Sequence, residues 1–278
     1  MKITGNIKGQ HKFKDGIKSF NYCVIIWSAA GSDSYVINGS DKSILWDGDE
    51  PIVIDKSVED LFTPIIKSTC TINLLTNIYL GDLLYAANPT SIKCVVYDTD
   101  SLSVLFWGFV TPTSYDQDFN SDYNSIQIQC IDLLSTLQYS KYIDNNYATA
   151  ALKSATDGGF SSFATIINRM ITPITDCPVS LGLDKSHAKL YSNNADFSNN
   201  LNLKINDKVF LGDNDEDQQS NEDVLSTILT FLNLTICVDG TDIIVFHKSI
   251  MTADSTTQYV YDLSSKTTST ITYNLPDS

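Results

Sequence analysis

The side chains in this sequence best suited to chemistry are carboxylates, and the densest group of them starts like a calcium-binding loop. Asp213, Asp215 and Asp217 stand at alternate positions, as oxygen ligands do at the start of an EF-hand loop. The sixth position is Gln218, where that loop needs glycine, and the twelfth is Val224, where it needs a bidentate glutamate. We therefore expect a solvated acidic loop or an acidic contact surface, and no calcium site.

Other patterns that support catalysis or metal binding do not occur. The three histidines stand alone, without a second close ligand or an HExxH motif: His11, His187 and His247. Neither a GxSxG elbow nor a phosphate-binding loop is present. A carboxylate pair of the glycosidase type can be drawn from Asp47, Asp49 and Glu50, but such clusters arise easily among 33 acidic residues. We predict that the chain is not an enzyme and holds no metal or cofactor.

The charge balance excludes several classes of partner. The formal net charge is -15, and Arg169 is the single arginine. Nucleic-acid binding needs clustered lysine and arginine to neutralise phosphates, so sequence-specific nucleic-acid binding is not expected. Anionic membranes are disfavoured for the same reason. The opening residues lack an apolar signal region and no stretch approaches eighteen apolar residues, so neither secretion nor membrane insertion is expected.

Positive charge gathers in the first twenty residues, where Asp15 is the only acid. The lysines of this stretch are Lys2, Lys8, Lys12, Lys14 and Lys18. One interpretation is a solvated arm. The other is a basic arm that docks on an acidic neighbouring subunit, which makes these lysines candidate interface residues.

Alternating hydrophobicity predicts strands throughout the first half. Cys70, Ile72 and Leu74 alternate with polar residues, and so do Ile126, Ile128 and Cys130. Runs at residues 92–96 and 104–110 predict one hairpin, and residues 113–119 and 123–130 predict a second. One short helix is expected between them and the N terminus, because residues 57–60 resemble a capping box and residues 61, 62, 65 and 66 share a helical face.

The second half mixes helices and strands. Phe163, Ile166, Ile167 and Met170 follow helical spacing, and Pro173 is expected to end that helix. Residues 201–205 alternate like a strand. Residues 220–223 then predict a helix cap, with an apolar stripe at positions 224, 228, 231 and 232. Residues 234–238 and 243–246 flank an Asp-Gly pair, which predicts a hairpin with a type I′ turn.

These patterns indicate a β-rich α+β fold with two small barrel-like or sandwich-like domains and a few short helices. The domains are predicted at residues 1–145, a β-barrel-like domain, and at residues 176–278, an α+β domain with a helix and a hairpin. Residues 146–175 are predicted to form a linker and helix. Six dispersed cysteines, mostly in apolar strand positions and without CxxC spacing, are expected to be buried free thiols.

Two aromatic sites differ in their expected role. Trp107 and Phe109 flank Gly108 in a predicted strand, where we expect core packing and a glycine that admits a close neighbour. Trp46 lies in a WDGD sequence that reads as an exposed turn, so it is the candidate interface anchor or sugar-stacking platform.

Several segments resemble proteins of bacteriophage tails. The sequence DVLSTILTFLNLTICVDGTDIIV at residues 223–245 is similar to a helix-then-hairpin segment of tail or baseplate hub proteins of tailed phages. WDGD at 46–49, DLFTPI at 60–65 and FWGFVTP at 106–112 are similar to tail proteins of Bacteroides-infecting phages. The resemblance implies a structural subunit that forms a trimeric or hexameric ring, contacts other phage tail proteins and belongs to the virion after synthesis in the bacterial cytoplasm.

Two other classes remain open. One is a carbohydrate-binding or receptor-binding (adhesin) module in which Trp46 and nearby tyrosines stack on sugar rings. The weakest is a hydrolase that uses scattered carboxylates. Glycan binding that disappears in Trp46→Ala distinguishes the first, and polysaccharide turnover lost on mutating an acidic pair distinguishes the second.

Overall fold

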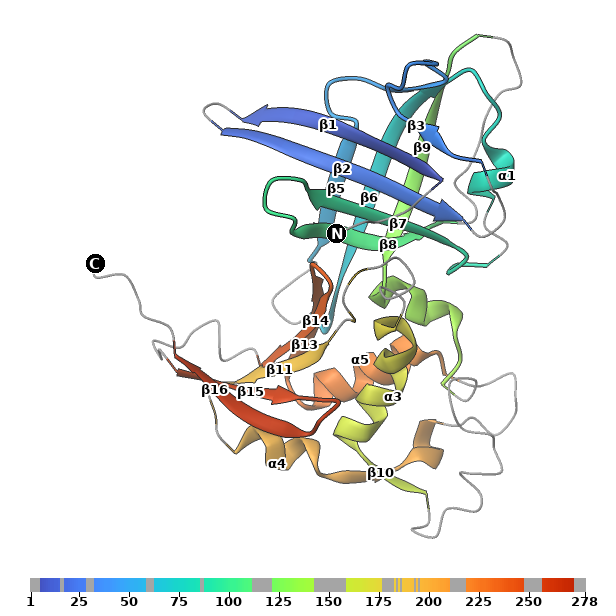
Figure 1. Cartoon of the computed structure of the whole chain (residues 1–278). Helices are drawn as coiled ribbons and strands as arrows, with labels where there is room; N and C mark the ends of the chain where they lie inside the picture. Colours follow the sequence, from blue (N-terminus) through green and yellow to red (C-terminus); the bar gives the residue numbers. More distant parts are fainter. Residues whose placement is uncertain are drawn as a thin grey trace.

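The computed structural model confirms the β-rich α+β class (Figure 1). It describes residues 6–15, 18–28, 33–58, 63–85, 88–111, 122–142, 159–176, 183, 185, 187–192, 194, 196–210, 219–247 and 257–272. Within these residues most strands join one mixed sheet, which passes from a barrel-like N-terminal half into a C-terminal half covered by helices.

The N-terminal half contains nine strands among the described residues. They are β1 (Ile7–Asp15), β2 (Lys18–Ser28), β3 (Tyr35–Val36), β4 (Ile44–Trp46), β5 (Ile52–Ser57), β6 (Ile65–Thr76), β7 (Ile92–Asp98), β8 (Val104–Val110) and β9 (Asn124–Asp132). A single turn of helix, α1 (Gly81–Leu84), precedes β7. The strands pair in the order β6, β9, β8, β7, β2, β1, β3, while β4 and β5 pair with the other edge of β6.

Alternation in the sequence produces the inner face of this half. Cys70, Ile72 and Leu74 of β6 are fully buried, and their intervening residues are more exposed. The hairpin predicted from residues 92–96 and 104–110 is β7 and β8, and it contains a bulge between Val96 and Tyr97. Strand β6 was predictable because it faces the core on alternate residues, whereas β8 is buried at residues 106–110 and follows from a continuous apolar run.

The two ends of this curved sheet meet through β3 and β4. The Ile37 N–H donates to the Lys8 carbonyl at 2.9 Å, and the Asn38 N–H donates to the Ile44 carbonyl at 2.8 Å. Trp46 adds a third link, because its Nε1–H donates to the Gln10 carbonyl at 3.0 Å. The N-terminal half is therefore a nearly closed barrel.

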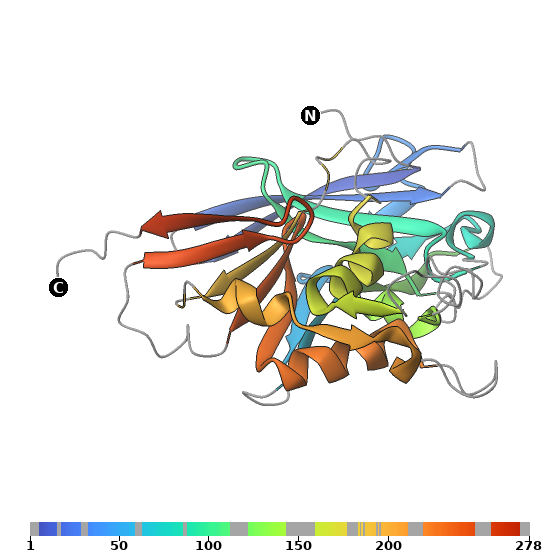
Figure 2. The same ribbon diagram turned by 90° about the horizontal axis from the view of Figure 1, so that it is seen from below.

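The C-terminal half is a layer of strands with helices on one face (Figures 1 and 2). Its sheet runs in the order β16 (Thr267–Thr272), β15 (Thr257–Asp262), β11 (Ala188–Ser192), β14 (Asp242–His247), β13 (Leu234–Asp239). The helices are α3 (Phe163–Thr175), α4 (Phe197–Leu201) and α5 (Asn221–Phe231). Short 3-10 helices η1 (Leu134–Tyr139) and η3 (Asp207–Phe210) and a small pair, β10 (Phe160–Ser162) with β12 (Lys204–Asn206), complete the described elements.

Both long helices follow the sequence pattern at their starts and depart from it later. The Ser220 hydroxyl and the Asp223 carboxylate form the predicted capping box of α5. Phe231, which was assigned to the buried stripe, is 70% exposed, because it is the last helical residue and lies beyond the packed face. Pro173 was expected to end α3, but the helix continues to Thr175.

The turn between β13 and β14 differs from the predicted type. Asp239 pairs with Asp242, so the two-residue loop is Gly240 and Thr241. Only Gly240 of these two has a positive φ, at 59°. A type I′ turn requires positive φ at both loop residues, whereas type II′ requires it at the first alone. The loop therefore has the φ signs of type II′.

Two local assignments were wrong and others lie outside the described residues. Ile65 and Ile66 begin β6 and do not belong to a helix, because they pair with β13 in a parallel ladder. Residues 201–205 divide between the end of α4 and β12. Residues 59–62, 113–119 and 213–217 lie outside the described part, and the domain limits at 145 and 176 stay a prediction.

Candidate functional site

The feature that organises the molecule is the junction between its two halves. Strand β6 belongs to both, because Thr69–Thr76 pair with β9 while Ile65 and Ile66 pair with Ile236 and Cys237 of β13. The Thr235 hydroxyl also donates to the Thr63 carbonyl at 3.2 Å. One backbone ladder therefore crosses from the barrel into the C-terminal sheet.

Strand β8 faces a different core on each side. Phe106 and Val110 point into the barrel cluster with residues such as Ile72. Trp107 and Phe109, both essentially buried, belong to a second cluster with η1, α3 and α5, and their rings lie 5.6 Å apart. The expectation of core packing for these two aromatics is confirmed. Strand β8 therefore packs against the barrel core with one face and against the C-terminal core with the other.

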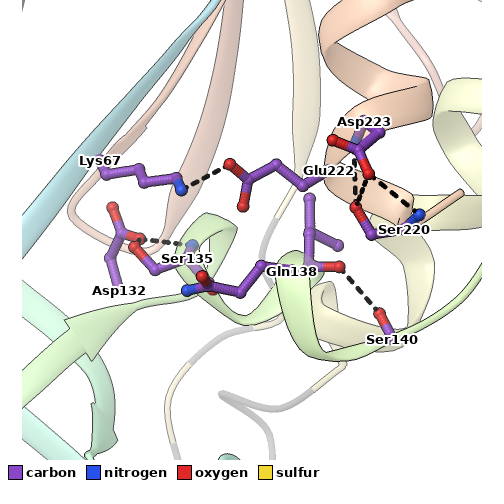
Figure 3. Close-up of polar contacts among 9 residues, drawn as sticks. Lys67, Asp132, Ser135, Gln138, Ser140, Ser220, Glu222 and Asp223 are labelled. Atoms are coloured by element: carbon purple, nitrogen blue, oxygen red, sulfur yellow. Dashed lines mark hydrogen bonds and ion pairs between the residues drawn. The ribbon is translucent and has the colours of Figure 1, made fainter.

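Asp132 is a buried carboxylate where β9 ends and η1 begins (Figure 3). It accepts hydrogen bonds from the Ser68 N–H at 2.6 Å, from the Ser135 N–H at 2.9 Å and from the Ser135 hydroxyl at 2.7 Å. Burial raises the pKa of Asp132, although the donors from Ser135 and Ser68 and the charge of Lys67 act in the opposite direction. Asp132 thus holds β6 against the start of η1.

An ion pair lies beside this carboxylate. Lys67 on β6 places its Nζ 2.6 Å from Oε1 of Glu222 on α5, and both side chains are about three-quarters shielded, with 30% and 25% exposure (Figure 3). Because the pair is partly withdrawn from water, its attraction is less screened than that of a surface pair.

The start of α5 is also bonded to the end of η1. The Asn221 N–H donates to the Ser140 carbonyl at 2.9 Å, and its side-chain Nδ2 donates to the Ser140 hydroxyl at 2.8 Å. The Tyr142 N–H donates to the Gln219 carbonyl at 3.0 Å. Asn221 is fully buried, so these bonds satisfy polar groups that water does not reach.

The polar groups at this junction hold the strands and helices in place. Asp132 is fixed by its donors, and the one hydroxyl among them, that of Ser135, is itself buried. Among the described residues, no group of three or more histidine, cysteine, aspartate or glutamate side chains is placed to hold a metal ion. In the same residues, no helix is both long and apolar enough to span a membrane.

The predicted basic arm is a hairpin. Lys8, Lys12 and Lys14 belong to β1 and Lys18 begins β2, because Ile7, Val24 and Ile26 anchor both strands in the barrel core. The side chains of Lys8 and Lys12 are exposed. Residues 7–15 and 18–20 are therefore strand and not a solvated arm, while the interface role of these lysines stays a prediction. Lys2 and the loop residues Asp213, Asp215 and Asp217 lie outside the described residues.

Trp46 is half-buried and serves the barrel. Besides its hydrogen bond to Gln10, its ring meets the edge of His11 at a centroid distance of 5.7 Å. It occupies the last position of β4 and packs against the barrel cluster, so it does not stand in an exposed turn. Its assignment as an interface or sugar-binding anchor is not tested by these contacts.

Sequence reasoning missed Asp132, Lys67 and Glu222. Asp132 is one of 33 acidic residues, and only the serine three positions later hints at a helix start that needs a side-chain acceptor. Lys67 and Glu222 are far apart in the chain and meet only because β6 pairs with β13. No sequence pattern links them.

No family model and no curated protein matches the chain. Among solved structures, it is similar to the 43 kDa tail protein of prophage MuSo2 from Shewanella oneidensis, with 12% sequence identity and a TM-score of 0.37. The match covers 70% of this chain and 53% of that one, so this chain spans about half the length of the prophage protein.

Proposed function

We propose that this chain is a structural subunit of a bacteriophage tail, of the hub or ring type, which assembles with copies of itself and connects other tail proteins in the virion. The proposal takes its starting point from the tail-protein motifs at residues 46–49, 60–65, 106–112 and 223–245. The structure supports it through the rigid connection between the two halves.

The observation that carries the proposal is the ladder between β6 and β13. A subunit that transmits force along a tail needs its two halves in one fixed relation. Here the β6–β13 ladder, the Lys67–Glu222 ion pair and the shared strand β8 oppose a hinge at the junction. Boundaries between independently moving domains usually fall in exposed linkers that few contacts cross, whereas here β6 pairs with strands of both halves.

Two of the four tail-protein motifs lie at the junction between the two halves. FWGFVTP at 106–112 contributes Trp107 and Phe109 to the core between the two halves, and the 223–245 segment supplies α5 and the β13–β14 hairpin. The motifs thus contribute to the junction itself. This placement supports a scaffold role over a catalytic one.

The test is the mass of the purified protein in solution, measured by light scattering over a concentration series and followed by electron microscopy of the same sample. We expect a trimer or a hexamer and ring-shaped particles. A monomer at every concentration, together with binding to a glycan array that disappears in Trp46→Ala, would replace this proposal with the adhesin class.

A further inference from the structure

The tip of the β1–β2 hairpin extends beyond the rest of the sheet. Strands β1 and β2 pair along their length, from Ile7 opposite Ile26 to Asp15 opposite Lys18. The pairing of β2 with β7 starts only at Tyr22, opposite Asp98. Residues 12–15 and 18–20, called the ribbon below, therefore have no third strand within the described part of the chain. Figure 1 shows this end of the hairpin projecting from the barrel.

The ribbon has the opposite charge to the rest of the molecule. It contains Lys12, Lys14 and Lys18 against Asp15, whereas the whole chain has a net charge of -15. An isolated two-stranded hairpin is marginally stable in water. A positive ribbon that projects from an acidic protein is thus suited to dock on an acidic surface that also offers a strand edge.

The same chain presents such a surface at the root of the ribbon. A cavity of about 220 Å³ lies between β1–β2 and β5, and its walls include His11, Tyr22 and Ile52. Asp49 and Glu50 line it as well and are exposed. Strand β5 pairs with β6 on one side, and no strand pairs with its other edge within the described residues.

We propose that two copies of this chain exchange their ribbons, so that the ribbon of each copy lies along β5 of the other with its lysines against Asp49 and Glu50. The proposal rests on the self-assembly in the proposed function and names the surfaces that perform it. Edge pairing supplies the third strand that the ribbon lacks, and the opposite charges select the partner.

The occupant is a second copy because ribbon and cavity adjoin in one molecule. His11 and Tyr22 line the cavity and form the cross-strand pair next to the root of the ribbon. A two-fold axis beside this point brings each ribbon to the other cavity in a single reciprocal contact, which is the geometry of an isologous dimer. Such a contact joins copies in pairs. Of the two ring sizes, it is compatible with a hexamer built from three pairs and not with a trimer.

Charge reversal tests the contact directly. One variant reverses the ribbon, Lys12→Glu, Lys14→Glu and Lys18→Glu, and the other reverses the cavity, Asp49→Lys and Glu50→Lys. We expect each variant alone to lose the paired state in light scattering, with at least a tenfold weaker self-association. Mixing the two variants restores pairs, because each ribbon then meets a cavity of opposite charge.

A matched control reverses three exposed lysines elsewhere, Lys42→Glu, Lys204→Glu and Lys266→Glu, and is expected to keep the wild-type mass. Circular dichroism and thermal unfolding of all variants verify that they fold. If the wild type assembles and both reversed variants assemble equally well, ribbon exchange is wrong while the structural role survives. If the wild type is monomeric at every concentration, self-assembly and ribbon exchange both fail. Variants that lose assembly without recovery on mixing also overturn the reciprocal contact.

Discussion

Lys67 Nζ lies 2.6 Å from Glu222 Oε1, and this ion pair joins the strand that leaves the barrel to the helix that covers the C-terminal sheet. The ion pair lies next to the carboxylate of Asp132, which is buried. Packing, backbone pairing and charge all converge on the start of β6. The stability of the whole chain should therefore respond to single substitutions at this point.

Removing the charge of Glu222 should weaken the junction. Glu222→Gln keeps the size of the side chain and is expected to lower the free energy of unfolding by about 1 kcal/mol, because the pair is partly shielded from water. Urea denaturation of Glu222→Gln, Lys67→Met and the double variant measures the coupling between the two residues. A coupling of zero, unchanged between low and high salt, would mean that packing alone holds α5 on β6.

Asp132 should make stability depend on pH. Burial raises the pKa of Asp132 in the folded protein above the ordinary 3.8. At pH values between 3.8 and this folded-state pKa, the folded protein therefore binds more protons than the unfolded chain. The free energy of unfolding contributed by Asp132 is therefore highest below 3.8 and decreases as pH rises through the folded-state pKa. Urea denaturation from pH 4 to pH 7 tests this against Asp132→Asn, which cannot titrate. The wild-type advantage over the variant should shrink with rising pH.

An advantage that grew with rising pH would show that the donors from Ser68 and Ser135 outweigh burial in the folded state. Asp132→Ala separates the two effects, because it removes the acceptor as well as the charge. Three donors then lose their partner inside the protein, and we expect a loss of about 3 kcal/mol at pH 4, which shrinks with rising pH as it does for Asp132→Asn.

Gly108 should tolerate no side chain. A Cβ placed there would lie 2.0 Å from the Ile131 carbonyl oxygen, which is backbone of the neighbouring strand and cannot move aside. Gly108→Ala is expected to lower the free energy of unfolding by about 3 kcal/mol. Gly48→Asn is the control, because nothing lies within 4 Å of that site and asparagine accepts its positive φ. Equal thermal stability of the two variants would contradict the close approach of β8 and β9.

The close approach at Gly108 illustrates what the sequence could reveal. A glycine between Trp107 and Phe109 in a strand pattern indicates a tight neighbour; β9 follows from local alternation and β8 from a continuous apolar run. The sequence did not reveal which strands cross the junction. Ile65 and Ile66 carry a helix-like pattern locally and become strand only because Ile236 and Cys237 offer a parallel partner. Tertiary pairing outweighed local propensity there.

The same limit applies to the polar junction. The capping box at Ser220 and Asp223 is local and was predicted, whereas the bonds from Asn221 to Ser140 connect segments that are distant in the chain. Charge composition, by contrast, indicated the unusual N-terminal lysines but not the hairpin that carries them. Contacts between residues close in the sequence could thus be predicted, whereas contacts between distant segments could not be known without the fold.

The barrel thiols should be inert until the protein unfolds. Cys70 and Cys130 face each other across β6 and β9 and are buried, and burial raises the pKa of Cys70 far above its ordinary value. The reactive thiolate is therefore scarce and inaccessible. Labelling with a thiol reagent at pH 8, followed by peptide mass spectrometry, should modify these two residues at the rate of global unfolding. Labelling much faster than the measured unfolding rate would reveal local opening of the barrel.

Substitutions of Trp107 should separate two contributions to stability in the core between the two halves, namely the volume of the side chain and its hydrogen bonding. Its side chain is 1% exposed, and its Nε1–H finds no acceptor among the described residues. Trp107→Ala should lower the free energy of unfolding by about 4 kcal/mol, because it leaves a large cavity. Trp107→Phe should lose only about 1 kcal/mol, since the smaller ring loses volume but also removes a buried donor without a partner. Denaturant unfolding of both variants measures the difference. If Trp107→Phe is as damaging as Trp107→Ala, the indole N–H makes a stabilising hydrogen bond, for example to a buried water, and the orphan donor is ruled out.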